Sequence, residues 1–138
     1  MPEMRYGHLA DFATIGANGK PILVGIFDRV ISIQSSPPIT VPQSYLFVKL
    51  ECSIGEGSEH GVAVRLRDGN GQVVGAPFEL EKLPFGASGP GYPLAAYIQL
   101  TIRGLQLAEP GDYEFEIVAD GERLGVVSLA AALVPPPQ

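Results

Sequence analysis

The chain has 138 residues, of which 46% are hydrophobic and 17% are charged, and its formal net charge is −6. This composition can fill a core and is not that of a disordered segment, so the chain is expected to fold alone. Nucleic acid binding needs a clustered positive face. The nine Lys and Arg residues are scattered singly, so nucleic acid is excluded as an expected partner.

Neither a targeting segment nor a membrane segment is evident in the sequence. The longest stretch without Gly or Pro, residues 43–54, contains Lys49 and Glu51, so we expect no membrane contact. The N-terminal residues lack the basic and apolar regions of a secretory signal. A single cysteine, Cys52, cannot form an internal disulfide, which fits a reducing compartment. A cytoplasmic location is therefore expected.

The first predicted elements are strands 5–16 and 21–33, joined by a turn at Asn18-Gly19. A two-residue turn there places Asp11 opposite Ile26 and diagonal to Asp28 on one face. Two neighbouring carboxylates could share a proton or hold a hard cation. The structural alternative, which we favour, is that Asp11 and Asp28 accept hydrogen bonds at the rim of the core. On the opposite face the same register sets Phe12 over Gly25 and Phe27 over Ala10, which indicates packing.

The next predicted strand, residues 44–54, has the clearest two-residue period. Its inward side carries Leu46, Val48 and Leu50, whereas Tyr45 and Phe47 point the other way. An exposed aromatic pair on a sheet face is a common basis for association, so Tyr45 and Phe47 form a candidate interface. The alternative is that a loop such as 34–43 or 82–93 folds over them.

Further alternating segments, cut by turn-forming residues, complete an all-β chain of about eight strands. Turn signals lie at residues 68–71 and at Asp120-Gly121. We expect a two-sheet antiparallel β-sandwich in one domain, residues 1–134, followed by a short Pro-rich tail, residues 135–138. The remaining strands are predicted at residues 61–68, 72–81, 94–103, 112–119 and 123–131.

The connection into strand 112–119 favours a particular kind of sandwich. Tyr113 follows Pro110-Gly111, as in the tyrosine corner of immunoglobulin-like domains, where the phenol caps backbone groups upstream. An immunoglobulin-like or related Greek-key topology is therefore expected. The chain has one Cys and no Trp, so a true immunoglobulin domain is excluded.

No residue pattern in the sequence indicates catalysis, a metal or a cofactor. His8 and His60 have no second ligand at metal-binding spacing. Cys52 falls on the inward side of its strand, where a thiol behaves as a small hydrophobe. The glycines of residues 55–61 open no helix and so lack the donors that cradle phosphate. An enzyme is therefore not expected.

Several segments resemble a family of small bacterial proteins of unknown function. They are residues 10–13, the Gly19-Lys20 turn, residues 23–28 with the pattern Gly-x-Phe-Asp, and the closing hairpin formed by residues 110–115 and Asp120-Gly121. The resemblance spans most of the chain. It implies the sandwich fold and brings no activity, ligand or catalytic residue.

These observations leave two functional hypotheses. The first is a non-enzymatic binding or assembly module that acts through protein–protein contacts, as a homodimer or with another protein, and it rests on Tyr45 and Phe47. The alternative is a sandwich that binds a small ligand, a sugar or a hard cation, through its loops or through Asp11 and Asp28.

Overall fold

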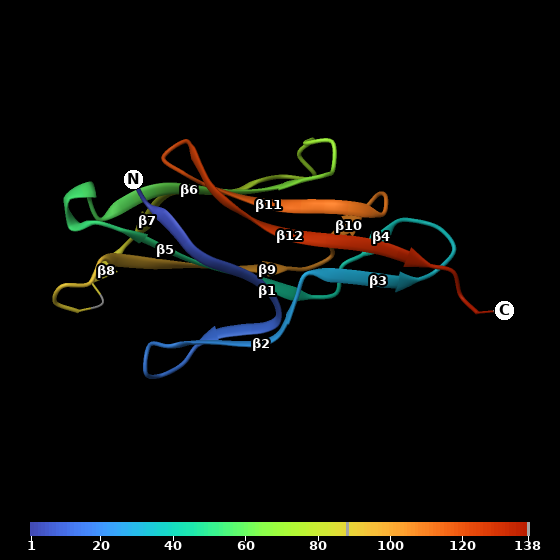
Figure 1. The fold of residues 1–138 in the computed structure, drawn as a ribbon, viewed down its shortest axis with the longest axis horizontal. Helices are drawn as coiled ribbons and strands as arrows, with labels where there is room; N and C mark the ends of the chain where they lie inside the picture. The colour runs from blue at the N-terminus through green and yellow to red at the C-terminus, as the bar shows by residue number, and fades with distance from the viewer. Residues whose placement is uncertain (88, 138) are drawn as a thin grey trace.

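A computed structural model describes residues 1–87 and 89–137 of the chain. In this part the chain forms β-strands and one short 3-10 helix, η1 (Ile54–Glu56), and the strands build two five-stranded sheets and a small two-stranded one (Figure 1). The predicted all-β class is confirmed. Among the described residues, no helix is long and apolar enough to span a membrane.

The first sheet is antiparallel throughout and has the order β2-β1-β5-β9-β8. The strand β2 forms one edge, next to β1, and the sheet faces the core through β5 and β9. The bounds are β1 (Glu3–Ile15), β2 (Pro21–Phe27), β5 (Ser44–Cys52), β8 (Gly86–Ala87) and β9 (Leu94–Ile102).

The second sheet has the order β3-β12-β11-β6-β7. Its first pair, β3 with β12, is parallel, so the expectation of a purely antiparallel sandwich is wrong at this pair. The bounds are β3 (Arg29–Ile33), β6 (Glu59–Arg67), β7 (Phe78–Pro84), β11 (Gly111–Ala119) and β12 (Glu122–Val134). The two-stranded sheet consists of β4 (Ile39–Thr40) and β10 (Gln106–Leu107).

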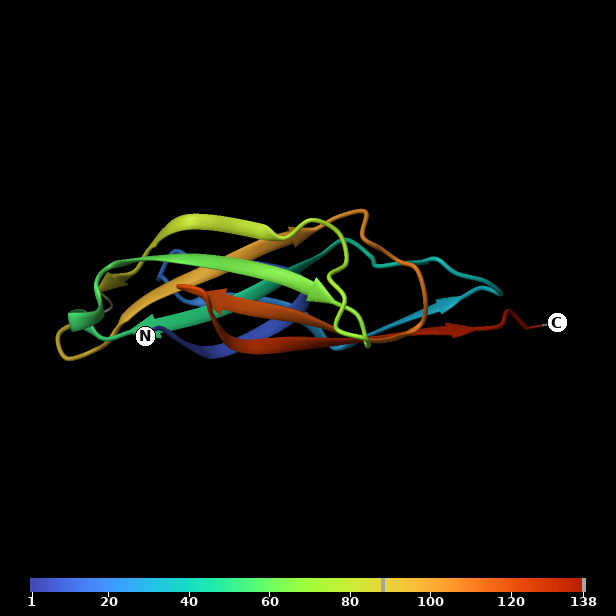
Figure 2. The ribbon, with the colours of Figure 1, turned by 90° about the horizontal axis from the view of Figure 1, so that it is seen from above.

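The core lies between the two large sheets, whose strands mostly run along the long axis of the molecule (Figure 2). Alternate residues of β5, including Leu46, Val48 and Leu50, are fully buried, as their two-residue period predicts. The hydroxyl of Tyr113 donates a 2.6 Å hydrogen bond to the Glu109 carbonyl oxygen, which confirms the predicted tyrosine corner. Immunoglobulin-like connectivity stays a prediction.

The predicted strand 21–33 is two strands in different sheets. β2 pairs with β1, and after Asp28 the chain crosses to pair β3 with β12. The Ala130 amide donates to the Asp28 carbonyl oxygen at the crossing. From the second sheet, Val30 is buried in the core. Of the predicted tail, residues 135–137 follow β12, and Gln138 lies outside the described residues.

The predicted strand 72–81 begins later than expected. The turn at residues 68–71 forms, and Val73 makes a single bridge to Arg67. Gly75 then adopts a φ of 70°, and Pro77 lacks an amide donor, so the ladder stops and β7 begins at Phe78.

The first hairpin has a different register from the predicted one. The Gly16 amide donates to the Lys20 carbonyl oxygen at 2.8 Å, so the loop holds three residues rather than two. In this loop only Gly19 has a positive φ, whereas the two-residue turn needs two such residues. The register therefore moves by one residue, and the predicted pairings of Phe12 with Gly25 and of Phe27 with Ala10 are wrong. Phe12 pairs with Val24, and Phe27 pairs with Leu9.

Candidate functional site

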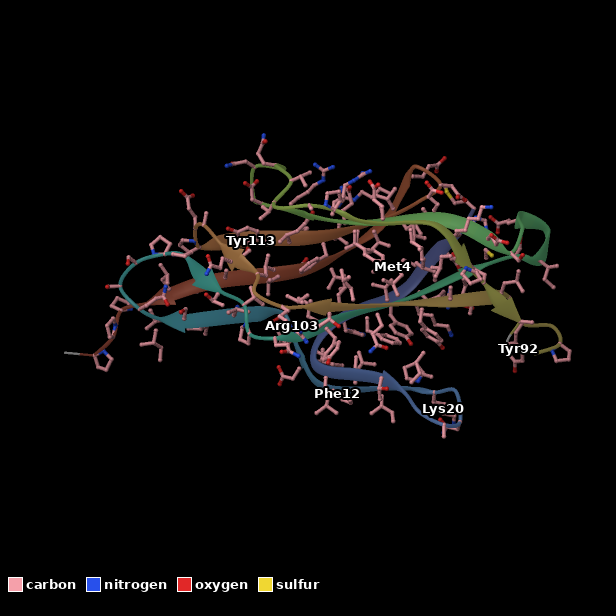
Figure 3. All side chains as sticks on the ribbon, turned by 180° about the vertical axis from the view of Figure 1, so that it is seen from behind. Met4, Phe12, Lys20, Tyr92, Arg103 and Tyr113 are labelled. Carbon is pink, nitrogen blue, oxygen red and sulfur yellow. The ribbon has the colours of Figure 1, made fainter. Side chains whose placement is uncertain are left out.

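The β1–β2 hairpin carries large apolar side chains that are exposed to solvent. The register pairs Phe12 with Val24, Thr14 with Ile22 and Ala10 with Ile26, so their side chains lie on one face. Val24 is 55% exposed and Ile26 is 58% exposed. Figure 3 shows Phe12 and Lys20 on this hairpin, which extends away from the body of the molecule. We name this set the β2 surface; it consists of Phe12, Ile22, Val24 and Ile26.

The strand β2 is also an unpaired edge. It stands at the end of the first sheet, and the described residues place no strand beyond it. No charged residue lies within Pro21–Phe27, while Lys20 and Asp28 flank the strand on either side. An uncharged edge strand with exposed apolar side chains is a template for pairing with another strand. The β2 surface and this edge together form the candidate site.

The structure places the two residues of the predicted aromatic interface differently. Phe47 has no exposed surface, so the premise that it is free for a partner is wrong. Its ring lies 5.3 Å from that of Tyr97 and 6.5 Å from that of Tyr6, measured between centroids. The amide of Gln99 donates to the Ala13 carbonyl oxygen, so the end of β1 curls over this face. The cover comes from strands of the same sheet.

Tyr45 lies at the border between these buried rings and the β2 surface. It is half-buried, and its ring meets Phe12 edge-on at a centroid distance of 5.9 Å. Burial raises the pKa of the nearby Tyr6 phenol, and the neighbouring Tyr97 phenol raises it further. Aromatic rings therefore run along the outer face of the first sheet from Tyr6 to the hairpin. A role of Tyr45 or Phe47 in an interface stays a prediction.

The predicted carboxylate pair loses its geometric basis. In the observed register Asp11 lies opposite Gly25, and its carboxylate occupies the space that a side chain at Gly25 would fill. Asp28 stands three residues further along, at an odd spacing that turns regular strand residues to opposite faces. Both side chains are exposed. Within residues 1–87 and 89–137, no three His, Cys, Asp or Glu residues are grouped as a metal site.

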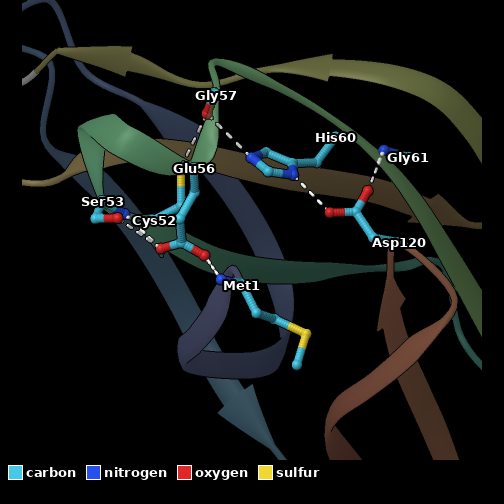
Figure 4. A network of polar contacts seen from close by, with 8 residues as sticks. All are labelled: Met1, Cys52, Ser53, Glu56, Gly57, His60, Gly61 and Asp120. Carbon is cyan, nitrogen blue, oxygen red and sulfur yellow. Dashed lines mark hydrogen bonds and ion pairs between the residues drawn. The ribbon is translucent and has the colours of Figure 1, made fainter.

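A polar network that the sequence did not reveal joins the loop around η1 to the β11–β12 turn (Figure 4). His60 Nδ1 lies 2.6 Å from Asp120 Oδ2, and His60 Nε2 lies 3.1 Å from the Gly57 carbonyl oxygen. Cys52 Sγ lies 3.6 Å from the same carbonyl oxygen. Asp120 lies 60 residues from His60 in the sequence, so spacing gives no signal for this contact. Asp120 meets His60 because the predicted tight turn holds it at a φ of 50°.

This network has the residue types of a catalytic triad without its chemistry. A carbonyl oxygen only accepts hydrogen bonds, so His60 Nε2 carries a proton and cannot take one from the thiol. Burial raises the pKa of the Cys52 thiol. The N-terminal amine acts in the opposite direction and lowers this pKa, whereas Asp120 raises it. The thiol is therefore kept in its unreactive form. At the same end, the Met1 amine pairs with Glu56, which also accepts from Ser53.

The outer face of the second sheet carries charges of both signs, which form ion pairs with one another. Glu116 is nearly buried, and its carboxylate lies 3.3 Å from Arg67, 3.6 Å from Arg65 and 3.8 Å from Arg123. All three arginine side chains therefore pair with this one carboxylate.

A cleft of about 450 Å³ opens between the ends of the two sheets. Apolar side chains line it, including Leu66, Leu100 and Phe115. Arg103 lies at the cleft, and the described part of the chain gives it no ion pair.

The solved structures to which the chain is similar include the Pseudomonas fluorescens alkylpurine DNA glycosylase AlkC bound to DNA containing an abasic site analog. The TM-score is 0.49 and the sequence identity is 12%. The similarity covers 95% of this chain but only 30% of that chain. A likeness of this degree carries no argument about activity.

The composition-based exclusion of nucleic acid is withdrawn, and the AlkC structure named above is a protein–DNA complex. An acidic net charge alone does not exclude such a partner. DNA binding is a property of that enzyme and is not transferred to this chain.

No curated protein matches the chain. One family model, described as a family of unknown function (DUF6941), matches residues 5–132. The match covers nearly the whole chain, in agreement with the resemblance to an uncharacterised family. The chain therefore belongs to DUF6941, a family whose function is unknown.

Proposed function

We propose that this chain is a non-enzymatic binding module that associates with protein through the edge strand β2. The observation that carries the proposal is the combination of an unpaired edge with the exposed β2 surface. Pairing of a further strand would satisfy the free backbone groups of β2 and remove Ile22, Val24 and Ile26 from water. Phe12, paired with Val24, would extend the same apolar contact.

The polar clusters support a binding role over catalysis. The thiol of Cys52 has a raised pKa, and the protonated Nε2 of His60 cannot serve as its base. Both residues are buried. We also propose a cytoplasmic location, which the unpaired thiol of Cys52 supports because free cysteines persist in reducing compartments.

Site-specific photo-cross-linking in cells tests the proposal. A photoreactive phenylalanine analogue replaces Val24 in β2, and the matched control replaces Leu80, which is 40% exposed in the edge strand β7. We expect discrete protein adducts from position 24 and none from position 80. Equal labelling at both positions, or no adduct at position 24, would overturn the proposal.

A second candidate function is the binding of a small apolar acid, which the cleft at Arg103 favours. The apolar lining of Leu66, Leu100 and Phe115 suits a hydrocarbon chain, and the unpaired guanidinium suits a carboxylate. A thermal-shift comparison of decanoate with decanol tests this idea. Decanoate should raise Tm more than decanol does, and Arg103→Gln should remove the difference. Equal shifts from the two compounds would rule the candidate out.

A further inference from the structure

We propose that the strand which pairs with β2 is the β2 of a second copy of this chain, antiparallel about a two-fold axis at Val24. The inference rests on the proposed function and names the partner. It requires that one register match the backbone edge, the side chains and the flanking charges of β2 in one copy with those of β2 in the other.

The backbone of β2 fits this register. The Gly16–Lys20 pair is hydrogen-bonded, and hydrogen-bonded and non-hydrogen-bonded pairs alternate along an antiparallel ladder. Ile22 and Val24 therefore direct their amides and carbonyls toward β1, and Leu23 directs its amide and carbonyl outward. With the axis at Val24, Leu23 of each copy faces Gly25 of the other, where a φ of 68° interrupts the regular alternation of β2. Pro21 has no amide to lose at its outward position.

The side chains of the β2 surface match across the same axis. Val24 faces its own counterpart, and Ile22 faces Ile26 of the second copy. These are non-hydrogen-bonded pairs, in which opposing side chains approach most closely. All of them are exposed in the single chain, so the pairing removes them from water in both copies.

The flanking charges select this register among the neighbouring ones. With the axis at Val24, Lys20 of each copy faces Asp28 of the other, which gives two ion pairs at the ends of the ladder. An axis at Leu23 sets Lys20 against Ile26, and an axis at Gly25 sets Asp28 against Ile22. Both charged side chains are exposed, and the described residues offer neither an ion pair within the chain. A two-fold interface of this kind is closed and self-complementary.

Disulfide trapping tests the register. Val24→Cys should form a disulfide-linked dimer under mild oxidation, because non-hydrogen-bonded antiparallel pairs have the Cα separation that a disulfide needs. Ile22→Cys and Ile26→Cys should cross-link when mixed, and each should cross-link poorly alone. The controls are the unmodified chain, whose Cys52 is buried, and Leu80→Cys on β7.

Charge reversal tests the ion pairs in solution. By sedimentation equilibrium, Lys20→Asp should weaken dimerisation by about three- to tenfold, since two exposed pairs are lost. The double variant Lys20→Asp with Asp28→Lys should restore it, because the same pairs form with exchanged signs. Lys82→Asp on β7 is the matched control and should leave the dimer unchanged.

The outcomes separate this inference from the proposed function. A chain that stays monomeric at its highest soluble concentration, with no Val24→Cys dimer, overturns the self-pairing. If photo-cross-linking at position 24 then gives an adduct whose mass is not twice 14.6 kDa, the proposed function stands with a different partner. If no adduct forms, both fail. A dimer that Lys20→Asp leaves unchanged, or that the double variant does not restore, overturns the register.

Discussion

β2 is one edge strand of the first sheet and β7 is one edge strand of the second, and the two strands differ in how they are protected. β7 carries Glu79, Glu81 and Lys82 within its seven residues, so a second strand that paired with it would meet charges. β2 has the same length and carries no charge between Pro21 and Phe27. The difference teaches that one edge is blocked against pairing and the other is left open.

The same contrast extends over the outer faces of the two sheets. Outside the first sheet, the buried ring of Phe47 is surrounded by aromatic neighbours. Outside the second sheet, Glu116 holds three arginine side chains. The outer face of the first sheet therefore carries a cluster of aromatic rings, and pairing at β2 would extend an apolar surface next to it.

The largest effect is expected at Phe47, because its ring has no exposed surface. Phe47→Ala should lower the free energy of unfolding by about 3–5 kcal/mol, through lost burial and a residual cavity. Phe78→Ala on β7 is the control; its ring is 37% exposed, and a loss of about 1 kcal/mol is expected. Denaturant unfolding measures both. Equal losses would show that the outer face of the first sheet is not a packed layer.

The next effect concerns the shape of β2. Gly25 has a φ of 68°, and a Cβ there would collide with the Asp11 carboxylate. Gly25→Ala should lower the free energy of unfolding by about 1–2 kcal/mol. Gly19→Ala is a matched control, since Gly19 has a similar φ of 77° and open space around it. A smaller loss at Gly25 than at Gly19 would contradict the contact with Asp11.

Much of the fold could be predicted because its signals are local. The two-residue period of Leu46, Val48 and Leu50 marks a buried strand face wherever the strand lies. Turn residues such as Asp120-Gly121 fix the hairpins. The break at Asp28 was not predictable in the same way, since the residues on both sides of it suit a strand and only the core decides which sheet each half joins.

The candidate site was harder to predict, because edge position and cover depend on the whole fold. The sequence shows that residues 21–27 are uncharged but not that they form an edge. The two-residue period of β5 predicts an exposed Phe47, yet the curl of β1 buries this side chain. The three-residue loop that begins after Gly16 shifts the register by one residue, so the cross-strand neighbour of Asp11 is Gly25 and not the predicted Ile26. The contact of His60 with Asp120 bridges strands whose pairing no spacing reveals.

Removing the acidic residues of β7 should make the two edges more alike. Glu79→Thr with Glu81→Thr removes both carboxylates beside Phe78 and Leu80, which are partly exposed, and leaves Lys82 as the charge of the strand. Stability should change by less than about 0.5 kcal/mol, because the replaced side chains are exposed. Light scattering at rising concentration should show new association that the parent chain lacks. A double variant that associates no more than the parent would show that the acidic residues are not what protects β7.

The smallest effect tests how apolar the outer face of the first sheet is. Burial, together with the Tyr97 phenol, raises the pKa of Tyr6 above its ordinary value of 10.0, so the folded state keeps the proton longer than the unfolded chain does. This contribution to stability is fully present below about pH 10 and is lost as the pH rises through the folded-state pKa, because deprotonation favours the unfolded chain. Tyr6→Phe should therefore lose less stability than the parent as the pH rises above 10. Tyr92→Phe removes an exposed phenol and is the control, and urea unfolding at stepped pH measures all three chains. If Tyr6→Phe and the parent lose stability in parallel, water reaches the Tyr6 phenol freely and the apolar layer ends before β1.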